Sequence, residues 1–335
     1  MSEPLVSIIS TERIYDPGCH CAFTDLTHWR GRVWLCFREA LNHSVHPSSH
    51  IVIMASADHG RTFQLMARIS SPGLDVRDPK FFVIEEKLHL VVPCWQLSDR
   101  TLLTFIARSS DGLDWEQHTI PALKGYVVWR PRKCVEQGKD VLYAAAYGKY
   151  SGDERHVKLL RSTNGLEWRD VSVIHDRDQP NETELCFLAS GELLALVRRE
   201  VDPFKPLLAR CSPPYTGPWK KIDCDQFFQG PLLERLDRGM LAIGRALEKP
   251  DQKEKNPRVT KMFSLNPETG ALAPFATLES GADNSYAGWA QLPAGAAAPW
   301  NVLISYYSGH GYDNGAWQGG ETPQRAAIFI VRARI

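Results

Sequence analysis

The sequence lacks any hydrophobic run close to the roughly 20 residues that a membrane-spanning helix needs. It also lacks an excess of either charge, because 39 Lys and Arg residues balance 39 Asp and Glu residues. Since a protein that neutralises phosphates needs a basic surface, this balance argues against a nucleic-acid partner. The chain does not begin with a basic segment and a long apolar run, so we expect no signal peptide, no membrane association and a cytoplasmic location.

The sequence contains eight cysteines in a chain of 335 residues. Without a predicted signal peptide, we expect them to be reduced. Four of them lie in apolar runs and are expected in the core: Cys36, Cys94, Cys134 and Cys186. The cluster Cys19-His20-Cys21 has no second Cys/His pair at zinc-site spacing, so we predict no metal and no other cofactor.

What the sequence does contain is repetition. Three segments share a Ser, an Asp or Asn, a Gly and a following aromatic residue: SADHGRTF at 56–63, SDGLDW at 110–115 and STNGLEW at 162–168. Asp or Asn caps such a turn and Gly supplies a positive φ, so each segment predicts a tight turn between two strands.

A second repeat precedes each turn and predicts the fold. Six segments align in one register, each followed by a polar turn and an apolar run: 20–26, 78–84, 130–136, 182–188, 230–236 and 286–292. Four strands for each of six units describe an all-β, six-bladed β-propeller. The last unit lacks a fourth strand, and the apolar residues 5–9 can supply it and close the ring. We therefore predict a single domain over residues 1–335.

Propeller topology selects candidate site residues. The first strand of each blade lines the central channel, and the second strand returns to the same rim. The first-strand positions are His20, Asp78, Arg130, Glu182, Gly230 and Tyr286, and the second strands end at Arg38, Trp95, Tyr147, Arg198, Arg245 and Tyr306. Several arginines around one mouth suit a small anionic ligand, because a guanidinium binds a carboxylate through two hydrogen bonds.

The repeated turns resemble the Asp-box of the sialidase (BNR-repeat) superfamily. The segment Asn181-Glu182-Thr183-Glu184-Leu185 followed by Val197-Arg198-Arg199 resembles the family's blade-four motif, and Asn284-Ser285-Tyr286 resembles the segment with its Tyr nucleophile. The resemblance implies Tyr286 as nucleophile, Glu182 as its base and a carboxylate clamp of Arg38, Arg198 and either Arg245 or Arg258. Sialidases are a known exception to the two-carboxylate scheme of glycosidases.

The sequence departs from the family pattern in blade one. The family's first carboxylate-binding Arg is replaced by His20, and the loop at 39–50, where the family has its acid/base Asp, contains no Asp. A general acid would then be Asp78 or a histidine of that loop, His43 first. Further candidate substrate-binding residues are Arg130, Tyr306 and His310.

These features favour an exo-acting glycoside hydrolase of the sialidase type. Its partner would be a small acidic sugar or a glycoconjugate terminus, with sialic acid or a related ulosonic acid as the terminal sugar. Two alternatives stay open: a propeller glycosidase or lyase that uses Asp78 and Glu182 as a carboxylate pair on another sugar, and a non-catalytic carbohydrate-binding propeller.

Overall fold

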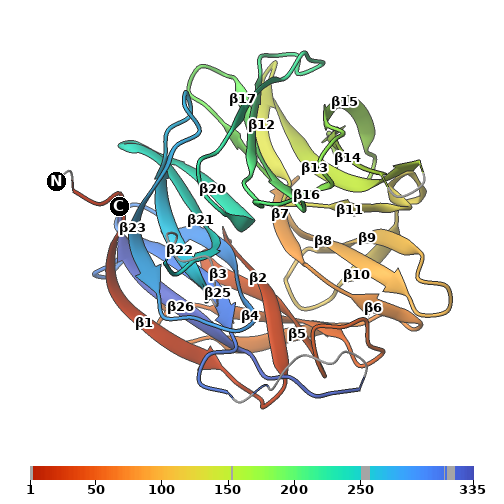
Figure 1. Cartoon of the computed structure of the whole chain (residues 1–335). Coiled ribbons are helices and arrows are strands. Elements are labelled where there is room, and N and C mark those ends of the chain that lie inside the picture. Colours follow the sequence, from red (N-terminus) through yellow and green to blue (C-terminus); the bar gives the residue numbers. More distant parts are fainter. Residues whose placement is uncertain (1–2, 152–153, 250–256, 313, 315–320) are drawn as a thin grey trace.

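The computed structural model describes residues 3–151, 154–249, 257–312, 314 and 321–335, and it confirms the six-bladed propeller. Six antiparallel sheets surround a central channel (Figure 1). The only helical element among the described residues is one 3-10 turn, η1 (Pro121–Leu123), so none of their helices could cross a membrane.

Each of the first three blades follows the chain from the channel outwards. Blade one contains β2 (His20–Trp29), β3 (Arg32–Ala40), β4 (His50–Ser56) and β5 (Gln64–Ile69). Blade two contains β6 (Leu74–Val76) and β7 (Lys80–Ile84), which share the innermost position, then β8 (Lys87–Gln96), β9 (Leu102–Ser109) and β10 (Glu116–Thr119). Blade three likewise contains β11 (Tyr126–Val128) and β12 (Arg132–Glu136), then β13 (Lys139–Ser151), β14 (Glu154–Ser162) and β15 (Arg169–His175).

The last three blades repeat the pattern. Blade four contains β16 (Pro180–Phe187), β17 (Leu193–Arg199), β18 (Leu207–Cys211) and β19 (Lys220–Asp223). Blade five contains β20 (Gln229–Leu236), β21 (Gly239–Leu247), β22 (Arg258–Leu265) and β23 (Leu272–Leu278). Blade six contains β24 (Asn284–Gln291), β25 (Val302–Ser308) and β26 (Ala327–Arg334), and its outermost strand is β1 (Ser7–Tyr15) from the start of the chain.

The ring closes as predicted, although the closing strand is longer than the apolar residues 5–9 suggested. β1 pairs antiparallel with β26, from Ser7 opposite Arg334 to Tyr15 opposite Ile328. Figure 1 shows the two ends of the chain, red and blue, side by side in this blade. The polar residues of β1 face solvent, so the hydropathy of the sequence did not show how far the strand extends.

The repeated turns join the third and fourth strands and pack each blade on the one before it. In the second turn, the Ser109 hydroxyl accepts a hydrogen bond from the Gly112 amide at 2.7 Å, and the Asp111 carboxylate accepts one from the Leu113 amide at 2.8 Å. Gly112 has a φ of +81°, and a Cβ there would lie 1.9 Å from the Trp34 ring of blade one. Only glycine allows both the left-handed backbone and this close approach.

A bulge in the innermost strands decides which residues face the channel mouth. In blade six, Ser285 pairs with Tyr307 and the next pair is Gly288 with Ser305. Two residues of β24, Tyr286 and Ala287, therefore lie opposite one residue of β25 and form the bulge. The innermost strands of other blades contain an equivalent bulge. Four residues that occupy the first position of the bulge have a positive φ: Phe23, Asp78, Gly230 and Tyr286. At the channel mouth, blade one therefore contributes Phe23, which lies three residues after the predicted His20.

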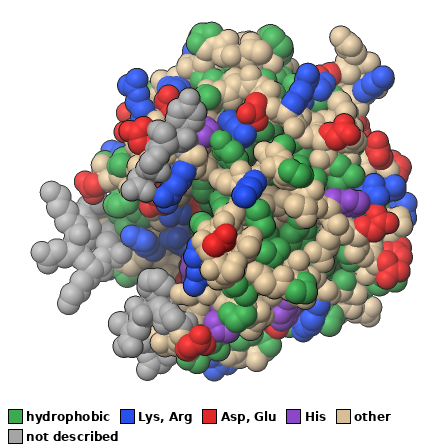
Figure 2. Space-filling view, turned by 90° about the vertical axis from the view of Figure 1, so that its right-hand side faces the viewer, with side chains coloured by type: hydrophobic (Ala, Val, Ile, Leu, Met, Phe, Trp, Pro, Cys, Tyr) green, Lys and Arg blue, Asp and Glu red, His purple; other side chains and the backbone are tan. Residues whose placement is uncertain are grey.

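Below the mouth, the channel is filled by an ion network between blades. Arg130 donates hydrogen bonds to the carboxylates of Asp25 and Glu184 and to the Ala287 carbonyl. Arg132 joins Glu184 to Glu234, at 2.7 Å to each. On the face seen in Figure 2, acidic and basic side chains are interspersed.

Candidate active site

Tyr286 and Glu182 meet at the mouth of the channel. The Tyr286 hydroxyl donates a hydrogen bond of 2.6 Å to Glu182 Oε1, and Arg198 donates one of 2.6 Å to Glu182 Oε2. The same guanidinium nitrogen lies 3.1 Å from the Tyr286 oxygen. Tyr286 has a φ of +51°, a conformation that is rare for a bulky residue and that concentrates at functional sites. The structure thus brings together Tyr286, Glu182 and Arg198, which the sequence placed at the rim of the channel.

Burial and charge act in opposite directions on the protonation states of Tyr286 and Glu182. Burial raises the pKa of Tyr286 well above its usual value; the negative charge of Glu182 adds to this, and Arg198 only partly opposes it. Burial alone would raise the pKa of Glu182 too, but Arg198 and the Tyr286 hydrogen bond outweigh burial and lower it. The resting site therefore holds a neutral phenol beside an ionised carboxylate. Arg198 favours the charge on Glu182 and does not create a resting phenolate.

Arg245 and Arg198 flank the Tyr286 ring from blades five and four. The Arg245 guanidinium lies 5.5 Å from the ring centroid and donates to Asp283 at 2.9 Å and to the Asn284 carbonyl. Arg198 also bridges to Glu200, while its Nε is buried without a partner among the described residues. Both arginines are thus partly neutralised by carboxylates of the protein.

Arg258, at the start of β22, is exposed and lies over the Phe227 ring. Burial of part of the side chain lowers its pKa, and the charges of Arg245 and Arg198 lower it further. The charge of Arg258 is thus coupled electrostatically to those of Arg245 and Arg198 at the mouth.

A pocket of about 730 Å³ opens beside the Tyr286–Glu182 pair and extends over blades two and three. Asp78 and His43, the two predicted general acids, both line it. Burial raises the pKa of Asp78, with Arg77 and Lys80 opposing and Glu182 reinforcing the shift. Aromatic side chains complete the walls: Phe23, Trp95 and Tyr147. Asn181 also lines the pocket, and its buried Oδ1 has no partner among the described residues.

Other predicted site residues lie away from this pocket. Arg38 is completely buried and donates to the Asn42 and Ser44 carbonyls and to Asp75. Arg130 is held in the channel network. His310 bonds to Ser308 and packs beside Phe329. None of these three, in the described part of the chain, lines the pocket next to Tyr286.

The blade-six register corrects the position of Tyr306. Tyr307, and not Tyr306, occupies the strand position of Arg198 and Arg245, because Ser305 pairs with Gly288 as Ile243 pairs with Leu232. Tyr306 points into the blade, stacks on Phe329 and donates to the Glu279 carbonyl. Tyr307 donates a hydrogen bond of 2.8 Å to Asp283 at the mouth.

Asp283 is the site residue that sequence reasoning missed. It directly precedes β24, and its carboxylate accepts hydrogen bonds from Arg245 and Tyr307 and bonds to two histidines, His20 and His43. Its position three residues before Tyr286 in the same segment was the available signal. A second pocket, of about 470 Å³, lies on the far side of His43 and is lined by both histidines, Asp283, Arg258 and Arg325.

Within the part of the chain that the structure describes, two groups of side chains could hold a metal ion by their geometry: His20 with His43 and Asp283, and Cys19 with Cys21 and Glu39. In the first group the Asp283 carboxylate already has four hydrogen-bonding partners, and Arg245 lies 2.9 Å from it. A metal ion there would replace the hydrogen bonds of His20 and His43 to Asp283 and would lie close to the Arg245 guanidinium. The three side chains therefore suit a hydrogen-bond network better than a metal site.

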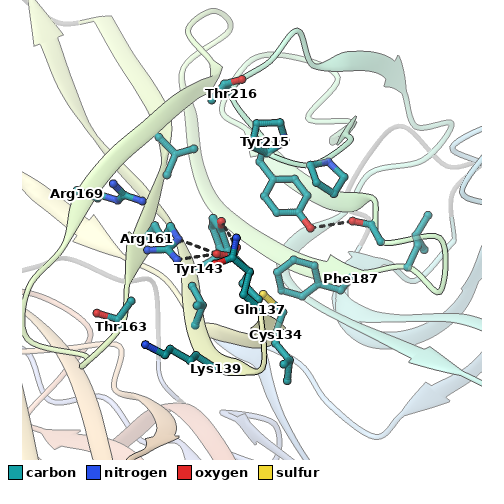
Figure 3. A pocket seen from close by; sticks show the side chains of 18 of the residues that line it. Cys134, Gln137, Lys139, Tyr143, Arg161, Thr163, Arg169, Phe187, Tyr215 and Thr216 are labelled. Atoms are coloured by element: carbon teal, nitrogen blue, oxygen red, sulfur yellow. Dashed lines mark hydrogen bonds and ion pairs between the residues drawn. The ribbon is translucent and has the colours of Figure 1, made fainter.

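Another hollow, of about 940 Å³, lies at the opposite end of the propeller between blades three and four. Figure 3 shows its walls, where Arg161 and Tyr143 both point to one carboxylate and the Tyr215 hydroxyl points to a backbone carbonyl. The carboxylate is that of Glu136, 2.6 Å from Arg161 and 2.5 Å from Tyr143. In this hollow the Glu136 carboxylate and the Tyr215 hydroxyl thus already have partners within the protein.

No protein-family model and no curated protein matches the chain. Solved structures match over its whole length. A protein of unknown function from Dyadobacter fermentans is 20% identical, with a TM-score of 0.73 over 99% of this chain and 100% of that one. The phage phi92 endosialidase is 11% identical, with a TM-score of 0.71 over 100% of this chain and 70% of that one. A Trypanosoma rangeli sialidase complex is 12% identical, with a TM-score of 0.64 over 97% and 58%. These similarities establish a sialidase-like propeller fold.

Proposed function

We propose that the protein is a glycoside hydrolase that removes a terminal carboxylated sugar, such as a sialic acid or a related ulosonic acid, with Tyr286 as nucleophile. The observation that carries the proposal is the 2.6 Å hydrogen bond from the Tyr286 hydroxyl to the buried, ionised Glu182. A phenol beside a carboxylate base is an activated nucleophile. Structural similarity to a phage endosialidase and a trypanosomal sialidase agrees with this reading.

The neutral phenol implies a concerted first step. As the Tyr286 oxygen bonds to the anomeric carbon, its proton passes to Glu182 and the bond from that carbon to the leaving oxygen breaks. A general acid, Asp78 or His43, protonates the leaving oxygen. Water then attacks the same carbon and gives its proton to the conjugate base of that acid, while Tyr286 leaves and recovers its proton from Glu182. Two displacements give retention of configuration.

A carboxylated sugar suits this site for electrostatic reasons. A carboxylate on the anomeric carbon would repel an anionic nucleophile, whereas a phenol is neutral until its proton moves. Arg198 and Arg245 lie beside Tyr286, and Arg258 is coupled electrostatically to both, so the three arginines supply positive charge for that carboxylate.

A second candidate function uses Asp78 and Glu182 without a tyrosyl intermediate. Both carboxylates line one pocket, and their environments raise the pKa of Asp78 and lower that of Glu182. Such a divergence is typical of a general acid paired with a base or nucleophile in glycosidases acting on neutral sugars.

The deciding experiment is turnover by Tyr286→Phe. Fluorogenic glycosides of sialic acid, its deaminated analogue and an eight-carbon ulosonic acid serve as substrates. Tyr286→Phe should lose on the order of 10³-fold or more in kcat/KM. Tyr306→Phe is the matched control. It also removes a tyrosine hydroxyl, but this hydroxyl points into the blade and bonds to the Glu279 carbonyl, so the variant should keep activity. Full activity of a folded Tyr286→Phe protein would exclude the tyrosyl mechanism and favour the carboxylate pair.

A further inference from the structure

Asp283 is the point where three blades meet at the channel mouth. Its Oδ2 lies 2.9 Å from His20 Nε2 and 2.5 Å from His43 Nδ1. Its Oδ1 accepts hydrogen bonds from Arg245 at 2.9 Å and from the Tyr307 hydroxyl at 2.8 Å. Four partners occupy the acceptor sites of one carboxylate, so its position and ionised state are fixed.

The two histidines that share Oδ2 differ in what else they can do. His20 is completely buried, and burial lowers its pKa to about 4, so it remains a neutral donor to Asp283. His43 has 39% of its side chain exposed and lines both the pocket beside Tyr286 and the pocket beyond it. Because its Nδ1 faces Asp283, its Nε2 is the nitrogen left for a ligand.

From this geometry we infer that Asp283 is a positioning residue that orients His43 as the general acid of the reaction. The inference rests on the proposed function and decides between its two candidate acids. Asp283 holds the His43 ring through Nδ1, so that Nε2 is the nitrogen directed at the leaving oxygen. A carboxylate that orients a histidine in this way fixes its tautomer as well as its direction.

The location of His43 agrees with this role. A general acid must reach the oxygen that joins the departing group to the terminal sugar. His43 stands between two hollows, and its ring contacts Phe23, which in turn contacts Tyr286 at 5.1 Å between centroids. Asp78, by contrast, lines only the pocket beside Tyr286, and the Arg77 guanidinium lies 3.9 Å from its carboxylate.

The test compares leaving groups in matched substrates. The phenolate of an aryl glycoside can leave without being protonated, whereas an alkyl or sugar leaving group needs a proton from the general acid. His43→Gln should reduce kcat/KM for the sugar-linked substrate by about 10²–10⁴-fold and for the aryl glycoside by less than about 10-fold. Asp283→Asn should show the same selectivity. His46→Gln, on the same loop but bonded to Ser48 and Glu321, should show neither loss.

Several results would overturn the inference. Selective loss in Asp78→Asn with His43→Gln unaffected would assign the acid to Asp78. Equal loss on both substrates in His43→Gln would make the residue structural. Inactivation by EDTA, reversed by Zn²⁺ or Mn²⁺, would make His20, His43 and Asp283 metal ligands.

A readout without turnover keeps this inference separate from the proposed function. At a pH where His43 is neutral, the ¹⁵N chemical shifts of the wild-type protein should show it as the Nδ1–H tautomer, which takes up the acid's proton at Nε2, and Asp283→Asn should abolish that preference. An Nε2–H tautomer in the wild type would refute the positioning role even if no substrate is found. Activity of Tyr286→Phe on both substrates would refute the proposed function alone.

Discussion

Glu184→Gln tests whether Arg130 belongs to the channel network or to the ligand site. Glu184 is completely buried; it accepts hydrogen bonds from Trp129 at 3.0 Å and from Arg130, and Arg132 lies 2.7 Å away. An amide keeps the shape but turns an NH₂ group towards these donors. Removing one partner of a buried ion pair destabilises by about 3–5 kcal/mol. Arg130 and Arg132 retain Asp25 and Glu234, so we expect the lower end, about 3 kcal/mol.

The assay is urea denaturation at neutral pH, with the free energy of unfolding as the readout. Glu116→Gln is the control: it removes a carboxylate 2.6 Å from Arg108 on the surface, where solvent screens the pair, and the midpoint should not move. If Glu184→Gln changes the unfolding free energy by less than about 1 kcal/mol, the network does not hold the channel together. Arg130 would then be available to a ligand, as the sequence first suggested.

The remaining predictions concern packing, pH and charge. Gly112→Ala should destabilise by about 1–3 kcal/mol more than Gly138→Ala, which has a similar φ but open space around it; equal unfolding temperatures would contradict the contact with Trp34. Because burial lowers the pKa of His20 to about 4, its neutral form stabilises the fold above about pH 6.5, and that stability declines towards pH 4 by on the order of 3 kcal/mol. His20→Gln should flatten this decline in denaturation curves between these pH values, and an unchanged slope would exclude His20 as its source. Arg258→Ala should raise KM for a carboxylated glycoside more than it lowers kcat.

The fold could be predicted because its signals are periodic. Turn residues and alternating apolar runs recur six times, and each unit needs a neighbour to bury its faces. The pairing of β1 with β26 followed from one missing strand. The same periodicity brought Tyr286, Glu182 and Arg198 together, since residues at equivalent strand positions meet at one rim.

The other residues at the channel mouth could not be predicted, because a bulge of one extra residue in a strand does not change the composition of the sequence. The bulge in β2 moved Phe23 into the ring where His20 was expected. An error of one residue in β25 exchanged Tyr307 for Tyr306 and reversed the side of the sheet that its ring faces. Asp283 lies in a connecting loop, where no repeat constrains its direction.

The charges at the mouth can now be assigned to partners, and this changes which arginine is available to a ligand. Arg198 lies between Glu182 and Glu200, and Arg245 is bonded to Asp283. Arg258, among the described residues, has no carboxylate within ion-pair distance, and its neighbours Arg245 and Arg198 repel its charge. An anionic group gains more beside a cation without an ion-pair partner than beside one that already has a carboxylate partner. Arg258 should therefore make the first contact with a substrate carboxylate, while Arg198 and Arg245 hold Glu182 and Asp283 in place for the proton transfers.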